Sequence, residues 1–157
     1  MDTPMDWREL PLEQMIPHRG RMRLIDRVLS LDDERSVTEA IPRPDWPLHS
    51  EGSVDCLVTI ELVAQTAALL EGWKRQRAGR GSASGYLVGI KSAKLLSPRL
   101  PVTFPLVTEV TRGYGLEGYA VFQGTVLSNG KVVAQVQVQT IRQEEGESSD
   151  RGVAEKE

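Results

Sequence analysis

The feature that most constrains the fold is one long apolar helical pattern near the middle of the chain. Apolar side chains recur there at spacings of three, four and seven residues, the period of an α-helix. They are Val54, Leu57, Val58, Leu62, Ala68 and Leu69. Ser53 is the expected N-cap and Gly79 the expected stop. We predict a buried helix of roughly 24 residues, about 36 Å long.

The segments around this helix have the composition of β-strands. Before it, residues 22–31 and 36–41 predict a hairpin, residues 9–16 a short helical turn, and the proline-rich residues 42–53 an irregular loop. After it, strands are predicted at 85–95, 101–112, 119–127 and 132–141. The dipeptide Asn129-Gly130 is typical of a two-residue hairpin. The predicted fold class is α+β, a curved antiparallel sheet wrapped around one helix.

Charge is distributed unevenly along the chain. The net charge is -3, but the acidic segment 144–157 alone carries -4 and leaves residues 1–143 at +1. We predict one folded domain over 1–143 and a disordered tail over 144–157. A nearly neutral domain gives no indication of nucleic-acid binding. No apolar stretch is long enough for a membrane span and no secretory signal is evident, so a cytoplasmic location is expected.

Four segments, in order, resemble the 3-hydroxyacyl-ACP dehydratases of fatty-acid synthesis. Residues 16–28 (IPHRGRMRLIDRV) are similar to the family's LPHRxPxLLIDRV, and residues 60–65 (IELVAQ) to its helical xEAxAQ. Residues 88–94 (VGIKSAK) resemble xGIDKAR, and residues 129–134 (NGKVVA) resemble the last hairpin, DGxxVAxA. The chain also resembles divergent dehydratase-like proteins of aryl polyene and related polyketide-type clusters.

This resemblance implies the hotdog fold, assembled as a dimer, and elimination of water from a 3-hydroxyacyl thioester. It implies His49 as the base and Glu61 as the group that assists the leaving hydroxyl, each from a different chain of the dimer. Neither a metal nor a redox cofactor is expected. Glu61 lies on an apolar helix, where desolvation would raise the pKa of its carboxyl. Gln65 is one turn further along and is expected to orient that carboxyl.

The loop that carries His49 departs from the family pattern. The family has GHFPxxPxxPG with its histidine fourteen residues before the helical glutamate, whereas residues 47–55 here are PLHSEGSVD and His49 lies twelve residues before Glu61. His49 as an ordinary loop residue therefore stays an alternative. His18, the other histidine, is expected to hold the N-terminal turn. The single cysteine, Cys56, is expected to be a small buried apolar residue.

The expected partner is an acyl carrier protein with its phosphopantetheine-linked acyl chain. Such a carrier is acidic, and the cations at the helix end could receive it or could only complement the helix dipole. These cations are Lys74, Arg75, Arg77 and Arg80. By resemblance, Gly89 and Val58 are expected along the acyl tunnel. Two alternatives remain: a hotdog acyl thioesterase in which Glu61 activates water, and a degenerate partner subunit that completes another hotdog dehydratase.

Overall fold

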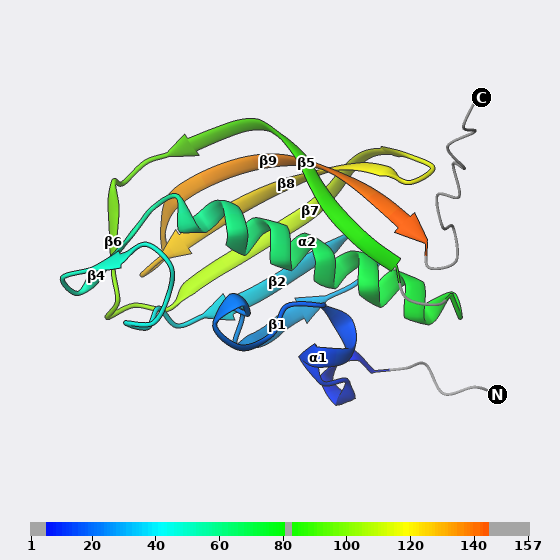
Figure 1. The fold of residues 1–157 in the computed structure, drawn as a ribbon, viewed down its shortest axis with the longest axis horizontal. Coiled ribbons are helices and arrows are strands. Elements are labelled where there is room, and N and C mark those ends of the chain that lie inside the picture. The colour runs from blue at the N-terminus through cyan, green and yellow to red at the C-terminus, as the bar shows by residue number, and fades with distance from the viewer. Residues whose placement is uncertain (1–5, 81–82, 145–157) are drawn as a thin grey trace, which may run out of the picture.

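The computed structural model describes residues 6–80 and 83–144, and its centre is one helix wrapped by an antiparallel sheet (Figure 1). The sheet has six strands in the spatial order β1-β2-β7-β8-β9-β5. Their bounds are β1 Arg27–Leu31, β2 Arg35–Ala40, β7 Leu106–Leu116, β8 Tyr119–Ser128, β9 Lys131–Glu144 and β5 Ala83–Leu95. Every neighbouring pair is antiparallel. The predicted α+β hotdog architecture is confirmed.

A second, smaller sheet and three short helical turns complete the described chain. The small sheet has the order β3-β4-β6 and lies at the N-terminal end of the central helix (Figure 1). Its strands are β3 His49–Ser50, β4 Ser53–Asp55 and β6 Arg99–Pro101. The turns are η1 Trp7–Glu9, α1 Leu12–Met15 and η2 Gly20–Met22. In the described residues, no helix has the length and apolar character that a membrane crossing requires.

The central helix, α2, spans Val58–Arg77 and is shorter than predicted at its start. Ser53 is not the N-cap, because Ser53–Asp55 form β4 and pair with β6. Asp55 instead accepts a hydrogen bond from the Leu57 main-chain nitrogen at 2.9 Å, just before the first turn. The end agrees with the prediction, since the helix stops at Arg77 and Gly79 follows with φ +67°. A positive φ is the conformation in which glycine commonly ends a helix.

The core lies between α2 and the concave face of the sheet. Leu62, Val63 and Leu70 of the helix have no exposed surface, and neither do Val126 and Val136 of the sheet. The two layers approach most closely at Gly124 of β8, where an added Cβ atom would lie 2.4 Å from a methyl carbon of Val63. Only glycine fits there, so this position fixes how deeply the helix lies in the sheet. Cys56 is 1% exposed, as expected for a small buried residue.

Three predicted segments differ from the structure. The predicted strand 22–31 is a strand only from Arg27, because the main chain of Met22 and Leu24 bonds to a helix side chain rather than to a neighbouring strand. The predicted strand 101–112 is divided into β6 and β7 by a turn before Pro105, which has no N–H for a ladder. The predicted loop 42–53 contains β3 and the first residue of β4.

Two local predictions are confirmed, the hairpin turn at Asn129-Gly130 and the short helical turn before Pro17. The predicted tail lies almost entirely outside the described residues. Asn129 and Gly130 both have positive φ, 49° and 74°, as a tight two-residue hairpin turn requires. Helix α1 ends before Pro17. The predicted disordered segment 144–157 lies outside the described residues, except for Glu144, which is the last residue of β9.

Gly72→Ala tests the contact between α1 and α2. An alanine inside a helix normally stabilises it by up to about 1 kcal/mol relative to glycine. Here the added Cβ would lie 2.3 Å from the Met15 carbonyl oxygen, so α1 must move away. We expect the free energy of unfolding to fall by about 1–3 kcal/mol, the usual range for overpacking. Urea denaturation measures it, with Lys74→Ala on the same helix as the control. A Gly72→Ala protein as stable as the parent would contradict the close approach.

Candidate functional site

Glu61 is in the first turn of α2, on the side that is open to solvent. Its neighbours in sequence, Leu62 and Val63, are fully buried, but 37% of the Glu61 side chain is exposed. The expected desolvation of this carboxyl is therefore not complete in the single chain. An acidic side chain at the N-terminal end of a helix is stabilised by the helix dipole. The carboxyl is accessible to a substrate or to a second subunit.

Gln65 holds Glu61 from one turn further along the helix. Its Nε2 donates to Glu61 Oε1 at 2.9 Å and to the Met22 carbonyl oxygen at 2.7 Å, while its Oε1 accepts from the Leu24 main-chain nitrogen at 3.0 Å. Gln65 has no exposed surface. Three hydrogen bonds thus fix the amide in one orientation. The one-turn spacing predicted the contact with Glu61, whereas the two bonds to the N-terminal segment could not be read from the spacing.

His18 also reaches Glu61, within the same chain. Its Nε2 lies 3.5 Å from Glu61 Oε1, which is an ion-pair distance and longer than a typical hydrogen bond. Burial lowers the pKa of His18, the nearby Glu61 carboxylate acts against this, and Arg19 adds to the lowering. His18 was expected to hold the N-terminal turn, and its contact with Glu61 was not predicted. The one sequence feature that could have pointed to this contact is the position of His18 in the segment that resembles the family's LPHR motif.

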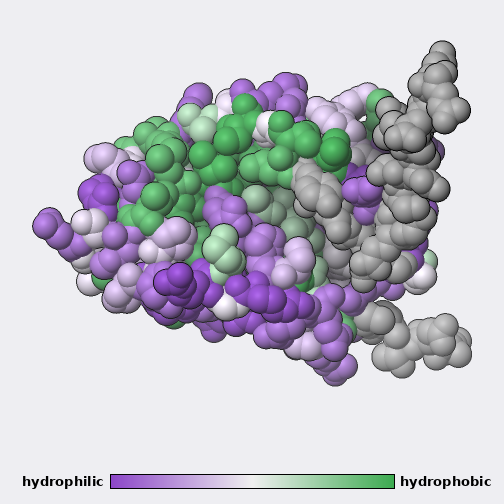
Figure 2. Space-filling view, in the orientation of Figure 1, coloured by the Kyte–Doolittle hydropathy of each residue, from purple (hydrophilic) through white to green (hydrophobic). Residues whose placement is uncertain are grey.

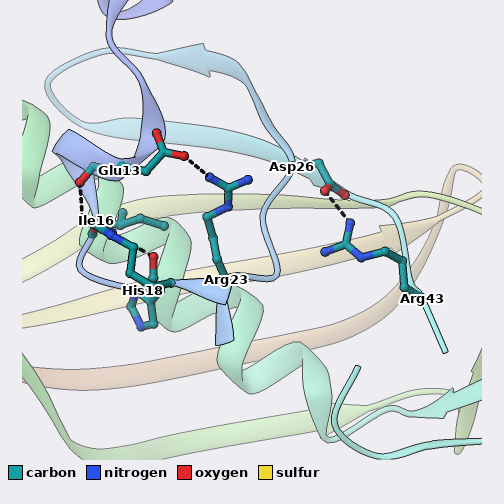
Figure 3. A network of polar contacts seen from close by, with 7 residues as sticks. Glu13, Ile16, His18, Arg23, Asp26 and Arg43 are labelled. Atoms are coloured by element: carbon teal, nitrogen blue, oxygen red, sulfur yellow. Dashed lines mark hydrogen bonds and ion pairs between the residues drawn. The ribbon is translucent and has the colours of Figure 1, made fainter. Parts of the chain in front are cut away.

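The N-terminal segment that carries His18 is fixed by arginines. Arg19 donates to the carbonyl oxygens of Glu13 and Ile16 at 2.5 and 2.6 Å, and Arg23 pairs with the Glu13 carboxylate at 2.7 Å. Figure 3 shows this group together with the pair between Asp26 and Arg43, 2.7 Å apart, at the start of the hairpin. These contacts explain why a segment with only two short helical turns, α1 and η2, keeps a defined position next to α2.

His49 occupies a different place. It lies in β3 opposite Val54, is half-buried, and follows Leu48, which has a φ of +64°. Arg99 holds this strand pair through bonds to Ser50 and Ser53. No ion pair joins His49 to Glu61 within the described chain. The single subunit therefore brings His18, and not His49, to the Glu61 carboxyl.

The predicted tunnel residues lie on α2 and β5, and the predicted docking residues lie around the C-terminal end of α2. Val58, the first residue of the helix, is 2% exposed, and Gly89 lies in the edge strand β5. At the other end, Arg75 is only 9% exposed, so its side chain is not displayed on the surface. Arg77 pairs with Asp33 and lies over the Trp73 ring, whereas Lys74 is half-buried and Arg80 is exposed. The predicted basic cluster is thus smaller than its sequence suggests.

One edge of the large sheet is apolar and has no neighbouring strand in the part of the chain that the structure describes. β5 is the last strand in the sheet order, with β9 on one side only. Leu87, Val88 and Ile90 on this strand are 44%, 52% and 48% exposed. Figure 2 shows hydrophobic side chains gathered over this region of the surface. An exposed, long and apolar edge strand is a template for pairing with another chain.

The family model, two curated relatives and one solved structure that this chain matches are all described as dehydratases. The family model described as ApeP-like, ApeP dehydratase, matches residues 10–150. The dehydratase FabZ of Polynucleobacter asymbioticus, a 3-hydroxyacyl-[acyl-carrier-protein] dehydratase, is 32% identical over 139 residues, with 80% of this chain and 85% of that protein covered. The FabZ of Vibrio atlanticus is 27% identical, with 85% and 91% covered. Among solved structures, the dehydratase heterocomplex ApeI:P from Xenorhabdus doucetiae has a TM-score of 0.80 at 20% identity, covering 87% of this chain and 93% of that one.

Gln65→Leu tests whether the buried amide holds the N-terminal segment on the helix. The substitution leaves the Leu24 N–H and the Met22 carbonyl without their partner, and each unsatisfied buried group costs about 1–3 kcal/mol. We expect a loss of about 2–4 kcal/mol in the free energy of unfolding, measured in urea. Gln76→Leu is the matched control, because Gln76 is on the same helix and its bond to the Gln14 carbonyl is at the surface. Equal losses in the two variants would contradict the assignment.

Proposed function

The chain belongs to the ApeP-like dehydratase family, and we propose that it eliminates water from a 3-hydroxyacyl thioester carried on an acyl carrier protein, giving the 2-enoyl thioester. The observation that carries the proposal is the Glu61 carboxyl. It is open to solvent, lies at the N-terminal end of the central helix, and is held by a fully buried amide. A surface carboxylate without a function has no need of a hydrogen bond from a buried amide that fixes its orientation.

The proposed elimination uses two side chains and the start of the helix. His49 takes the proton from C2 of the acyl chain, and the electron pair of that C–H bond forms the C2=C3 double bond. The C3–O bond breaks, and Glu61 gives its proton to the departing hydroxyl, which leaves as water. Main-chain N–H groups in the first turn of α2 stabilise the charge that develops on the thioester oxygen. The proton on His49 then returns to Glu61 for the next cycle.

A second hotdog subunit is needed to bring these groups together. Within one chain, His49 and Glu61 are not in contact, and β5 presents an apolar unpaired edge. We propose that β5 pairs with β5 of a second copy, so that His49 of one chain faces Glu61 of the other. The ApeI:P relative is a heterocomplex, and a different hotdog subunit could occupy the same edge. In either assembly, Val58 and Gly89 lie next to the acyl chain.

The acidic carrier would approach the C-terminal end of α2. The exposed Arg80 and the half-buried Lys74 are the cations available there, with Arg77 already paired to Asp33. Arg75 is excluded from the proposed dock by its burial. Electrostatic attraction of this kind affects the rate of encounter more than the affinity.

A partner-subunit role without independent activity is the second candidate function. It is favoured by the shortened His49 loop. In this case the protein would contribute Glu61, and the other subunit would contribute the histidine. Activity that appears only after addition of a second hotdog dehydratase subunit would select this candidate.

Glu61→Gln and His49→Gln test the proposed chemistry. Each removes a proton-transfer group, and we expect the rate of enoyl formation to fall by about 100- to 10,000-fold. The substrate is 3-hydroxyacyl carrier protein, and the product is measured by mass spectrometry. Glu117→Gln, an exposed carboxyl before β8, is the matched control. Full activity in either variant would reject its role. Release of a free carrier thiol without an enoyl product would indicate a thioesterase.

Val88→Lys tests the proposed edge pairing. A charge on the exposed face of β5 opposes pairing with another chain. We expect a dimer to become a monomer by light scattering after size exclusion, and the dehydratase rate to fall with it. Leu116→Lys is the control, because Leu116 is also exposed, at 65%, but is on β7 and away from the sheet edge. A variant with an unchanged mass would contradict pairing through β5.

A further inference from the structure

The proposed elimination uses Glu61 and His49 and leaves His18 without a role. His18 nevertheless makes the described chain's only contact between a histidine and Glu61, with Nε2 3.5 Å from Oε1. It is one of two histidines in the protein. Three quarters of its side chain is buried, in a segment that arginine contacts and the Gln65 amide hold in place.

The contacts of Glu61 are concentrated on one of its two oxygens. Gln65 Nε2 donates to Oε1 at 2.9 Å, and His18 Nε2 faces the same atom. In the part of the chain that the structure describes, no hydrogen bond reaches Oε2. Since one oxygen is held by the protein, the other is left to face a substrate. Hydrogen bonds at catalytic groups are often long before substrate binds, and a separation of 3.5 Å is in keeping with that state.

The surroundings of His18 favour one protonation state. Its Nδ1 is buried without a hydrogen-bond partner. A protonated ring would leave an unsatisfied N–H at this atom, whereas the neutral ring with hydrogen on Nε2 does not. The charged groups near the ring are Glu61 on α2, Arg19 in the same segment, and the Glu13–Arg23 pair beyond it. A neutral Nε2–H group can donate to Glu61 in either protonation state of the carboxyl.

We propose that His18 is a positioning residue for Glu61: its Nε2–H, together with the Gln65 amide, holds Oε1 so that Oε2 is directed at the substrate hydroxyl. The inference rests on the proposed function for the identity of that substrate. The contact between His18 and Glu61 is a property of the single chain and can be tested separately. His18 therefore acts through Glu61 and needs no contact with substrate.

Two substitutions at His18 separate positioning from space filling. His18→Gln removes the ring but can place an amide N–H near the position of Nε2, whereas His18→Phe keeps the ring and removes the donor. We expect His18→Phe to lower kcat by about 10- to 100-fold with KM little changed, the size of effect that a displaced catalytic group produces. His18→Gln should recover most of the rate. Equal losses, or a larger loss in His18→Gln, would overturn the proposal.

A titration followed by NMR tests the contact without any substrate. The two imidazoles give two sets of ring signals, which His18→Gln and His49→Gln assign. Glu61 raises the pKa of His18 against the effect of burial, so Glu61→Gln should lower the pKa of His18 further. An unchanged His18 pKa in Glu61→Gln would overturn the inference. A lowered His18 pKa in a protein without dehydratase activity would support the contact and reject only the proposed function.

Discussion

The hydrogen bonds of the Gln65 amide are the interaction on which the candidate site depends. A glutamine without exposed surface in the middle of an apolar helix is costly unless each polar atom is satisfied. Its three bonds satisfy the amide and simultaneously supply the main-chain groups of Met22 and Leu24, which have no strand beside them. The same side chain therefore holds the N-terminal segment against α2 and presents Glu61 next to it. Gln65 therefore contributes both to the stability of the fold and to the arrangement of the candidate site.

The helix is also fixed in rotation by polar contacts to the sheet. Thr66, the residue after Gln65, is hydrogen bonded to the Thr38 hydroxyl at 2.9 Å, and its carbonyl oxygen accepts from Ser36 at 2.8 Å, both inside the core. Apolar packing alone would tolerate small rotations of a helix that is buried on several sides. Because polar partners have directions, Gln65 and Thr66 allow only one rotation. Glu61 is thereby kept at the open side of the helix rather than inside the sheet.

Local patterns in the sequence predicted most of the fold, and contacts between distant segments explain what they missed. The period of α2 and the alternation in β9 are properties of neighbouring residues, so both were predicted. Ser53 was assigned as a cap because serine is a good cap in general, but its backbone pairs with Pro101 of β6, 48 residues away. The strand predicted from Met22 failed for the same reason, since the partner of its main chain is a helix side chain. Glu61 was expected from the family resemblance and Gln65 from its one-turn spacing to Glu61, whereas the contact of His18 with Glu61 is made across 43 residues.

In the proposed dehydratase, the two histidines have separate roles: His49 is the base, and His18 supports Glu61. A base that comes from another subunit can act only when the carboxyl it works with already has a defined orientation. His49 lies on a two-residue strand in a small sheet. The carboxyl must then be placed by its own chain, and the Gln65 amide and the fixed N-terminal segment are available for that purpose. Assembly of the site would in this way join two parts that are each ordered beforehand, which lowers the entropy lost when substrate binds.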